Sequence, residues 1–326
     1  MKSHISEQNN KILFDWFSMT TSISDTSDII ELLGLQNCPF TDVPGAKGWK
    51  KRLYFSGISI HYEGHDGLIW LEMSGQGCRT FETLGHGDFN TLFRFVLDNP
   101  KEVNITRLDV AYDDYKYYLD IDRIASDTLN GRFIAKTRHW NVDISDTGMC
   151  ITHGSRNSSV LIRIYDKAAE RNRKDEIEHW VRCEIMLRRE RAFEFIRLLC
   201  DENELLDNLY FAVINHYIRY IELSDTDSNK WRSEMAEHWA AFANSVTSDS
   251  ITLYVNPGME YNALRLSAYV SDRNAGPIYT YIKLFGINDL VERVFDKAPV
   301  NLNPKYRFLL AEDTALKQRG VNIDCR

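Results

Sequence analysis

The chain has 326 residues, which is enough for one large domain or two ordinary ones with a sizeable core. Its formal net charge of −8 argues against a general coat protein for nucleic acids, although local basic patches could still bind DNA. The six cysteines show no CxxC spacing, so free thiols in a reducing compartment are the simplest account. The N-terminus is polar and no run approaches roughly 20 apolar residues, so we expect a cytoplasmic protein without a membrane span.

The first half of the chain predicts short strands, turns and one clear helix. A glycine-rich loop comes first, in which four basic residues surround Trp49: Lys47, Lys50, Lys51 and Arg52. This mixture suits contact with DNA and is explained about equally well by solubility. The expected elements that follow are strands at 57–62 and 68–73, an exposed turn at 74–79, a helix at 88–97 and a strand at 105–114.

The second half repeats this order in a weaker form, which suggests a duplication. Strands are predicted at 149–153, 160–166 and 180–189, a charged helix or loop at 168–178, and helices at 191–200 and 201–223. Short strands that alternate with helices on short connections predict an α+β fold with an antiparallel sheet. Two similar sheet units would then pack side by side.

A polar break at 224–229 predicts a domain boundary, which separates 1–223 from a mainly helical region at 224–326. In this second region, helices are expected at 230–246, after Pro257, at 277–283 and at 290–297. The last two meet at a glycine-containing turn. Composition favours an ordinary helical hairpin there, and a helix-turn-helix that contacts DNA is the alternative.

The strand at 160–166 and the residue after it carry an unusual polar face. The period of two places Arg163, Tyr165 and Lys167 on one side. In the strand at 180–189, Glu184 lies on one face with polar neighbours. A phenol between two cations and beside a strand-borne carboxylate suits a tyrosine nucleophile that attacks a phosphodiester.

The strand at 105–114 adds Asp109 and Asp113 on the face opposite its apolar side. If Asp109 and Glu184 lie on neighbouring strands, they form an all-oxygen site for a hard divalent ion such as Mg²⁺ or Mn²⁺. Asp113 is roughly 13 Å from Asp109 along an extended strand, so both cannot bind one ion unless the strand bends. We favour Asp109, which is nearer the middle of the apolar run.

Each of these residues also has a structural explanation. A strand tyrosine usually packs, and Arg163 and Lys167 could form a solvated face. Asp109 and Asp113 could pair with arginines on an adjacent strand, and Glu184 could balance Arg182 or Arg188. Glu72 shares a strand face with Trp70 and is a further candidate, although pairing with Arg79 explains it more simply. The three strands together favour a site.

The three segments resemble the motifs of a known family. They are Ile-Thr-Arg-Leu-Asp-Val-Ala-Tyr-Asp-Asp at 105–114, Ile-Arg-Ile-Tyr-Asp-Lys-Ala-Ala-Glu-Arg at 162–171 and Trp-Val-Arg-Cys-Glu-Ile-Met-Leu-Arg-Arg at 180–189. Their order and spacing resemble the replication initiation factor family, over roughly residues 12–200. That family includes rolling-circle initiators of plasmids and related relaxases of integrative elements and phages.

The resemblance implies that the 1–223 region nicks one DNA strand at a double-strand origin. A tyrosine becomes joined to the 5′ phosphate, and the released 3′ hydroxyl primes synthesis. By position, Tyr165 matches the nucleophile, and Asp109 and Glu184 match acidic positions that would hold the metal. Arg163 and Lys167 match basic positions beside the tyrosine. Many rolling-circle nucleases have a His-hydrophobic-His pair for the metal, which this chain lacks.

The expected partner is therefore an origin with a hairpin or single-stranded nick site. Candidate DNA contacts are Lys50, Lys51, Arg52, Arg171, Arg182 and Arg188. The resemblance also implies a host helicase, a DNA polymerase, a homodimer, and origin recognition within 224–326. Two alternatives remain: a DNA-binding regulator that lost the chemistry, and a nuclease in which a metal-activated water attacks and Tyr165 is dispensable.

Overall fold

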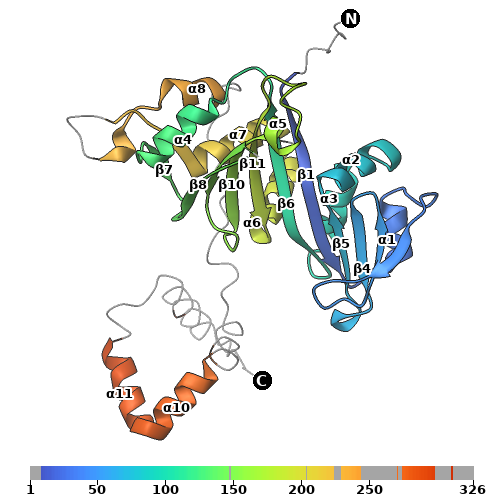
Figure 1. Cartoon of the computed structure of the whole chain (residues 1–326). Helices are drawn as coiled ribbons and strands as arrows, with labels where there is room; N and C mark the ends of the chain where they lie inside the picture. Colours follow the sequence, from blue (N-terminus) through green and yellow to red (C-terminus); the bar gives the residue numbers. More distant parts are fainter. Residues whose placement is uncertain are drawn as a thin grey trace, which may run out of the picture. The chain divides into compact units, whose positions relative to one another are not determined.

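The computed structural model describes residues 9–146, 148–202, 204–223, 229–243, 270, 274–297 and 310. The chain divides into two compact units, Met1–Tyr254 and Val255–Arg326, and each is described by itself. The first unit is an antiparallel sheet with helices packed on it, as shown in Figure 1. The expected α+β class with an antiparallel sheet is confirmed.

Ten strands form this sheet. Their bounds are β1 (Lys11–Thr21), β2 (Thr41–Pro44), β3 (Lys51–Phe55), β4 (Ile58–Tyr62), β5 (Ile69–Met73), β6 (Val103–Asp114), β8 (Trp140–Ser145), β9 (Gly148–His153), β10 (Val160–Asp166) and β11 (Val181–Arg188). The order across the sheet is β2-β3-β4-β5-β1-β6-β11-β10-β9-β8. The two long strands β1 and β6 pair at its centre.

The sheet consists of two halves with the same topology. Each half starts with its central strand, β1 or β6, and continues through a helix, α1 (Thr26–Leu32) or α4 (Ile121–Leu129). The chain then crosses to the outer edge and returns strand by strand, ending at β5 or β11 beside the central strand. Two helices close each half: α2 (Gly75–Leu84) and α3 (Phe89–Asp98), or α6 (Glu190–Asp201) and α7 (Leu206–Tyr217). The two sheet units suggested by the sequence are thus halves of one continuous sheet.

The core lies between the helices and one face of the sheet. Strand β6 turns Leu108 and Val110 into this core, so its alternate residues point to the other face. Helix α3 buries Phe89, Phe93 and Val96 along one stripe, and the Asp88 side chain caps it by accepting from the Asn90 amide at 2.9 Å. The opposite face of β6 carries the carboxylates that the sequence singled out.

Two expected elements differ in the structure. The turn expected at 74–79 is the start of α2, because the Ser74 hydroxyl caps the helix and Cys78 is buried in the core. The helix expected at 201–223 ends early, and its last residues form β12 (Ile218–Tyr220), which pairs with β7 (Phe133–Ala135). The helix ends at Tyr217 because the next residues pair with β7, a strand distant in the sequence.

The helix expected at 230–246 is broken in two. A 3₁₀ turn, η2 (Lys230–Arg232), is followed by a bridge between Ile221 and Met235 and then by α8 (Glu237–Ala243); residues 244–246 lie outside the described part. Trp239 and Phe242 of α8 are fully buried in the first unit. The sequence predicts a boundary after residue 223, whereas the first unit of the structure extends to Tyr254.

In the second unit, the structure describes α10 (Ala275–Phe285) and α11 (Ile287–Lys297). Gly286 joins them with φ +85°, a conformation that glycine adopts freely, and the Tyr281 hydroxyl donates to Asp289 at 2.6 Å. The two predicted helices are confirmed, whereas the helix predicted after Pro257 falls outside the described residues. Among the helices that are described, none has the length and apolarity to span a membrane.

Substituting Trp239→Ala should destabilise the first unit by about 3–5 kcal/mol, since the indole is fully buried against Tyr220 and Phe242. Urea unfolding followed by circular dichroism measures the change. Trp231→Ala is the matched control, because that side chain is 62% exposed and should change stability by less than about 0.5 kcal/mol. Equal stability of both variants would show that α8 does not belong to this core.

Candidate active site

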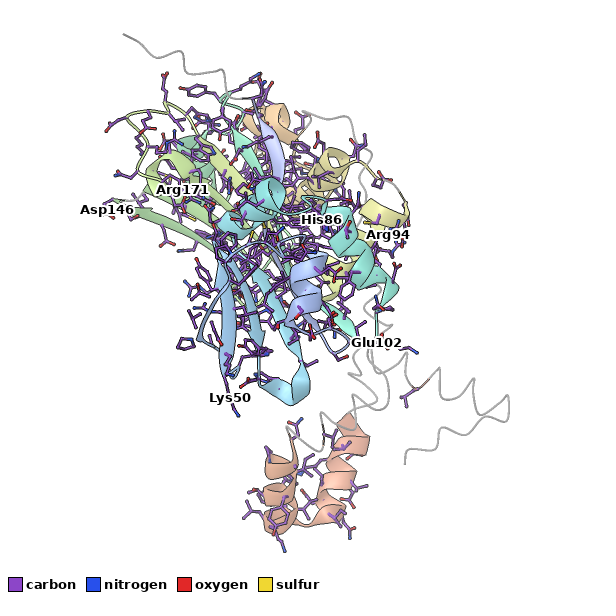
Figure 2. The ribbon with its side chains drawn as sticks, turned by 90° about the vertical axis from the view of Figure 1, so that its right-hand side faces the viewer. Lys50, His86, Arg94, Glu102, Asp146 and Arg171 are labelled. Atoms are coloured by element: carbon purple, nitrogen blue, oxygen red, sulfur yellow. The ribbon has the colours of Figure 1, made fainter. Side chains whose placement is uncertain are left out.

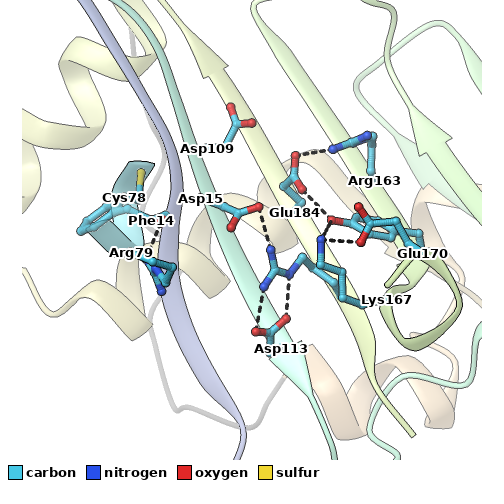
Figure 3. Close-up of polar contacts among 12 residues, drawn as sticks. Phe14, Asp15, Cys78, Arg79, Asp109, Asp113, Arg163, Lys167, Glu170 and Glu184 are labelled. Carbon is cyan, nitrogen blue, oxygen red and sulfur yellow. Dashed lines mark hydrogen bonds and ion pairs between the residues drawn. The ribbon is translucent and has the colours of Figure 1, made fainter. Parts of the chain in front are cut away.

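Strands β6, β11 and β10 place the predicted site residues in neighbouring positions on one face of the sheet. Glu184 on β11 lies directly opposite Arg163 on β10, and Arg182 lies opposite Tyr165. On its other side, Arg182 lies opposite Asp113 of β6. Opposed residues in an antiparallel pair project from the same face, so these side chains lie together on one face of the sheet. Figure 3 shows Asp113, Arg163 and Glu184 on this face.

The Tyr165 phenol is held by groups on three sides. Its hydroxyl donates to Glu184 at 3.0 Å, and the Lys167 ammonium donates to the phenol oxygen at 3.4 Å. The Arg163 guanidinium and the Lys167 ammonium lie 5.2 Å and 5.3 Å from the centre of the ring. The arrangement of a phenol between two cations and a carboxylate, expected from the sequence, is present.

Lys167 reaches the phenol from outside the strand. It is the first residue of α5 (Lys167–Glu170), where the Asp166 carboxylate caps the turn by accepting from the Ala169 amide at 2.8 Å. The side chain is only 3% exposed, and its ammonium pairs with Glu170 at 2.7 Å. Burial and the nearby charge of Arg182 lower the pKa of Lys167, against the opposite effect of Glu170.

Glu184 is a buried carboxylate that remains ionised. One oxygen accepts from the Arg163 guanidinium at 2.7 Å and the other from Tyr165. Burial alone would raise the pKa of Glu184, but the charges of Arg163 and Arg182 outweigh it and hold the pKa below its usual value. This carboxylate is therefore a fixed negative charge beside the phenol.

Asp109 is the second buried carboxylate of this face. It accepts from Arg107 at 2.8 Å, and this arginine stacks at 4.1 Å from the centre of the Trp16 ring. Burial raises the pKa of Asp109 to about 7, with the charge of Glu184 acting in the same direction and Arg107 opposing it. Arg107 was not among the expected site residues, although it shares the strand face of Asp109.

Arg182 and Asp113 form a buried ion pair. Asp113 accepts from Arg182 through both oxygens at 2.7 Å and 2.8 Å, and from the Trp180 indole at 2.8 Å. The remaining guanidinium nitrogen lies 2.7 Å from Asp15 of β1, as an ion pair outside hydrogen-bond geometry. Asp113 is thus held in a buried pair by Arg182, and its predicted role as a metal ligand stays a prediction. Arg182, only 4% exposed, has no exposed donor for the predicted contact with DNA.

The environment of Tyr165 also differs from the expectation that cations would favour the phenolate. Burial and the charge of Glu184 raise the pKa of Tyr165, and Arg182 and Arg163 offset only part of the increase. The phenol is therefore neutral in the protein alone.

The carboxylates Asp109 and Glu184 fit a hard divalent ion in their chemistry. Within the described residues, no group of three His, Cys, Asp or Glu side chains could hold a metal by itself. Mg²⁺ is commonly held by one or two carboxylates together with phosphate oxygens and water, so two are sufficient when DNA supplies the rest. Glu184 raises the pKa of Asp109, and a cation near both would relieve this repulsion.

The remaining predicted DNA contacts are spread over the first unit. Lys50 and Arg171 are exposed and lie at separate places on the surface, as Figure 2 shows. Lys51 pairs with Glu63 at 2.6 Å, Arg171 with Glu170 at 3.2 Å, and the Arg52 guanidinium lies over Tyr54. Arg188 lies on the same face as Glu184 and has a buried Nε without a hydrogen-bond partner.

Comparisons with known proteins agree with the motifs. A family model described as "Replication initiation factor" matches residues 103–291, and one described as "Rolling Circle replication initiation protein N-terminal domain" matches residues 11–97. The putative DNA relaxase NicK of Bacillus subtilis is 27% identical over 267 residues, covering 76% of this chain and 74% of that protein. The solved structure of a rolling-circle replication initiator protein from Geobacillus stearothermophilus aligns with a TM-score of 0.66 and 28% identity. It covers 72% of this chain and 96% of the other.

The raised pKa of Asp109 predicts a stability that depends on pH. Between the ordinary pKa of 3.8 and about 7, the folded state binds a proton at Asp109 that the unfolded state has lost, so stability falls as pH rises through this range. The loss is at most about 4 kcal/mol. Asp109→Asn should remove this contribution, so urea unfolding at pH 5 and pH 8 should differ less for the variant. An unchanged pH dependence would contradict the assignment.

Proposed function

Because this chain belongs to the replication initiation factor family, we propose that it nicks one strand of DNA at a specific site and later rejoins it, with Tyr165 as nucleophile. The observation that carries the proposal is the Tyr165 hydroxyl, which donates to Glu184 at 3.0 Å between Arg163 and Lys167. A buried phenol with a proton acceptor and two cations suits attack on a phosphodiester. The names of the relaxase and the initiator that resemble this chain support the same activity.

In the proposed step, the phenol oxygen forms a bond to phosphorus as its proton passes to Glu184. The bond between phosphorus and the 3′ oxygen breaks, and this oxygen leaves as a 3′ hydroxyl after taking up a proton. The 5′ phosphate stays joined to Tyr165, so the energy of the broken bond is kept and rejoining needs no ATP. The 3′ hydroxyl can prime DNA synthesis.

Two residues and one strand of this chain assist the step. Lys167, whose ammonium lies 3.4 Å from the phenol oxygen, stabilises the charge that develops there. Arg163 orients Glu184 through a 2.7 Å hydrogen bond and is partly exposed, so it can also reach a phosphate oxygen. The rigid strand β10 fixes the direction of the phenol for in-line attack.

We further propose that Asp109 and Glu184 hold Mg²⁺ or Mn²⁺ together with the scissile phosphate. When bound, such an ion polarises the phosphate and neutralises negative charge in the transition state. Its charge near Glu184 would also counteract the main electrostatic cause of the raised pKa of Tyr165. This gives a reason for the phenol to become reactive only when metal and DNA are both present.

Two other functions make different predictions. A regulator with the same fold would bind DNA without nicking it, and an activated-water nuclease would cut without a covalent adduct. The hydrogen bond between Tyr165 and Glu184 favours the tyrosine mechanism over both. A homodimer, a host helicase, a DNA polymerase and origin recognition within 224–326 remain predictions from the family.

Tyr165→Phe should abolish the covalent protein–DNA adduct and leave DNA binding within about twofold, because only the nucleophilic oxygen is removed. The measurement is denaturing gel electrophoresis after incubation with Mn²⁺ and labelled single-stranded hairpin origins from the protein's own genetic element. Tyr115→Phe is the matched control, since this tyrosine stacks on Trp180 beside the same site and should keep the adduct. An adduct in Tyr165→Phe, or cleavage without any adduct in the native protein, would rule out the proposed nucleophile.

Asp109→Asn should raise the Mn²⁺ concentration needed for half-maximal nicking by at least about tenfold, because one of two protein ligands is weakened. Asp113→Asn is the contrasting variant. Its carboxylate is bonded to Arg182, so we expect lower thermal stability and an unchanged Mn²⁺ requirement. A shift in Asp113→Asn alone would move the metal site away from Asp109.

A further inference from the structure

A pocket of about 410 Å³ opens on the first half of the sheet, and the proposed chemistry does not use it. Three tryptophans and three cations line most of it: Trp16, Trp49, Trp70, Lys47, Arg107 and Arg188. Trp16 lies directly opposite Asp109 across β1 and β6. Opposed residues share a face, so the pocket and the Tyr165 site open on the same side of the sheet.

Most residues that line the pocket belong to the half of the sheet that repeats the topology of the Tyr165 half. Strands β4, β5 and β1 correspond to β10, β11 and β6 in topology. Glu72 lies opposite Ser59 and Trp70 opposite His61, just as Glu184 lies opposite Arg163 and Arg182 opposite Tyr165. Glu72 and His61 thus lie on the strands that correspond in topology to those of Glu184 and Tyr165.

The corresponding residues in the first half suit stacking rather than nucleophilic chemistry. His61 is buried and stacks on Trp70, with ring centres 4.2 Å apart and planes 17° apart. Burial, together with the charges of Arg52 and Lys47, lowers the pKa of His61 to about 4, so the ring is neutral at pH 7. Trp49 extends the aromatic surface at 5.1 Å from Trp70.

An exposed cation covers one face of the Trp70 ring. The Lys47 ammonium lies 4.4 Å from the centre of the Trp70 ring and 3.7 Å from Glu72, and its side chain is 70% exposed. Exposed ion pairs of this kind contribute little to stability, so Lys47 can move aside.

The pairing of Glu72 with Arg79 expected from the sequence is wrong, because Arg79 pairs with Glu82 instead.

Two arginines also line the pocket. Arg107 and Arg188 lie directly opposite each other on β6 and β11, where like charges repel. The Nε of Arg188 is buried and has no hydrogen-bond partner. Arg107 packs its guanidinium over Trp16 and donates to Asp109. A phosphate between the two guanidinium groups would satisfy the free donor and relieve the repulsion.

We propose that this pocket binds one unpaired nucleotide of the DNA strand being nicked, with its base on Trp49 and Trp70 and its phosphate on Arg107 and Arg188. The inference rests on the proposed function and extends it. Stacking requires a base with a free face, which a nucleotide inside a duplex does not offer. Because Arg107 holds Asp109, the bound nucleotide would lie beside the candidate metal ligand and hold the strand in register for Tyr165.

The test measures binding of a labelled oligothymidylate of about twelve nucleotides by fluorescence anisotropy. EDTA and the Tyr165→Phe background prevent cleavage. Trp49→Leu should weaken binding about tenfold, because stacking on one tryptophan is lost. Trp140→Leu, on an exposed tryptophan of β8, is the matched control and should bind normally. Trp49→Phe should restore most of the affinity, which excludes a folding defect.

A second measurement locates the nucleotide. Oligonucleotides with one abasic position each should reveal a position where wild-type binding falls, and Trp49→Leu should suffer no further loss there. A neutral methylphosphonate in place of the adjoining phosphate should weaken binding by the wild-type protein. It should not weaken binding by Arg188→Gln any further. Wild-type affinity in Trp49→Leu, equal effects of Trp140→Leu, or equally strong competition by free thymidine monophosphate would overturn the inference.

The two proposals fail in distinguishable ways. If the covalent adduct forms on Tyr165 while the pocket variants bind DNA normally, the nicking function stands and the pocket inference is rejected. If no adduct forms but Trp49→Leu still weakens single-strand binding and Trp140→Leu does not, the pocket binds a nucleotide and the catalytic proposal is rejected.

Discussion

The buried guanidinium of Arg182 is the interaction on which the candidate active site depends. It extends from β11 and joins Asp113 of β6 to Asp15 of β1, so one side chain ties together three adjacent strands on the open face. Removing one partner would leave a charge buried without compensation, which costs far more than an exposed pair. These ion pairs join the central strands beside Tyr165 and the buried carboxylates.

The same cation also sets the electrostatics of its neighbours. It lies opposite Tyr165 in the strand pairing, helps keep Glu184 ionised and lowers the pKa of Lys167. Burial and Glu184 nevertheless hold Tyr165 in its neutral form. The phenol is thus neutral in the protein alone, and in the proposed mechanism a metal ion bound with DNA supplies the further positive charge.

The repeated topology gives this chain two halves of one sheet, and their open faces differ in chemistry. The second half holds a phenol, cations and carboxylates, whereas the first half holds tryptophans and a neutral, stacked histidine. The central pair of strands joins the two, since Arg107 contacts both Asp109 and Trp16. Under the two proposals, a strand of DNA that lies across β1 and β6 is held by one half and cut by the other.

The sequence by itself determined which residues form the candidate site and which face of each strand carries them. The period of two in a strand places Arg163 and Tyr165 on one side, and the motifs around Asp109 and Glu184 identify the family. Only the tertiary structure decided which charges are neutralised: Asp113 is bonded to Arg182, and Asp15 joins them from a strand almost 100 residues before Asp113. It also decided that Tyr165 is buried and neutral, and that Trp49 lies against Trp70. Burial and strand pairing depend on segments far apart in the chain, and local periodicity cannot supply either.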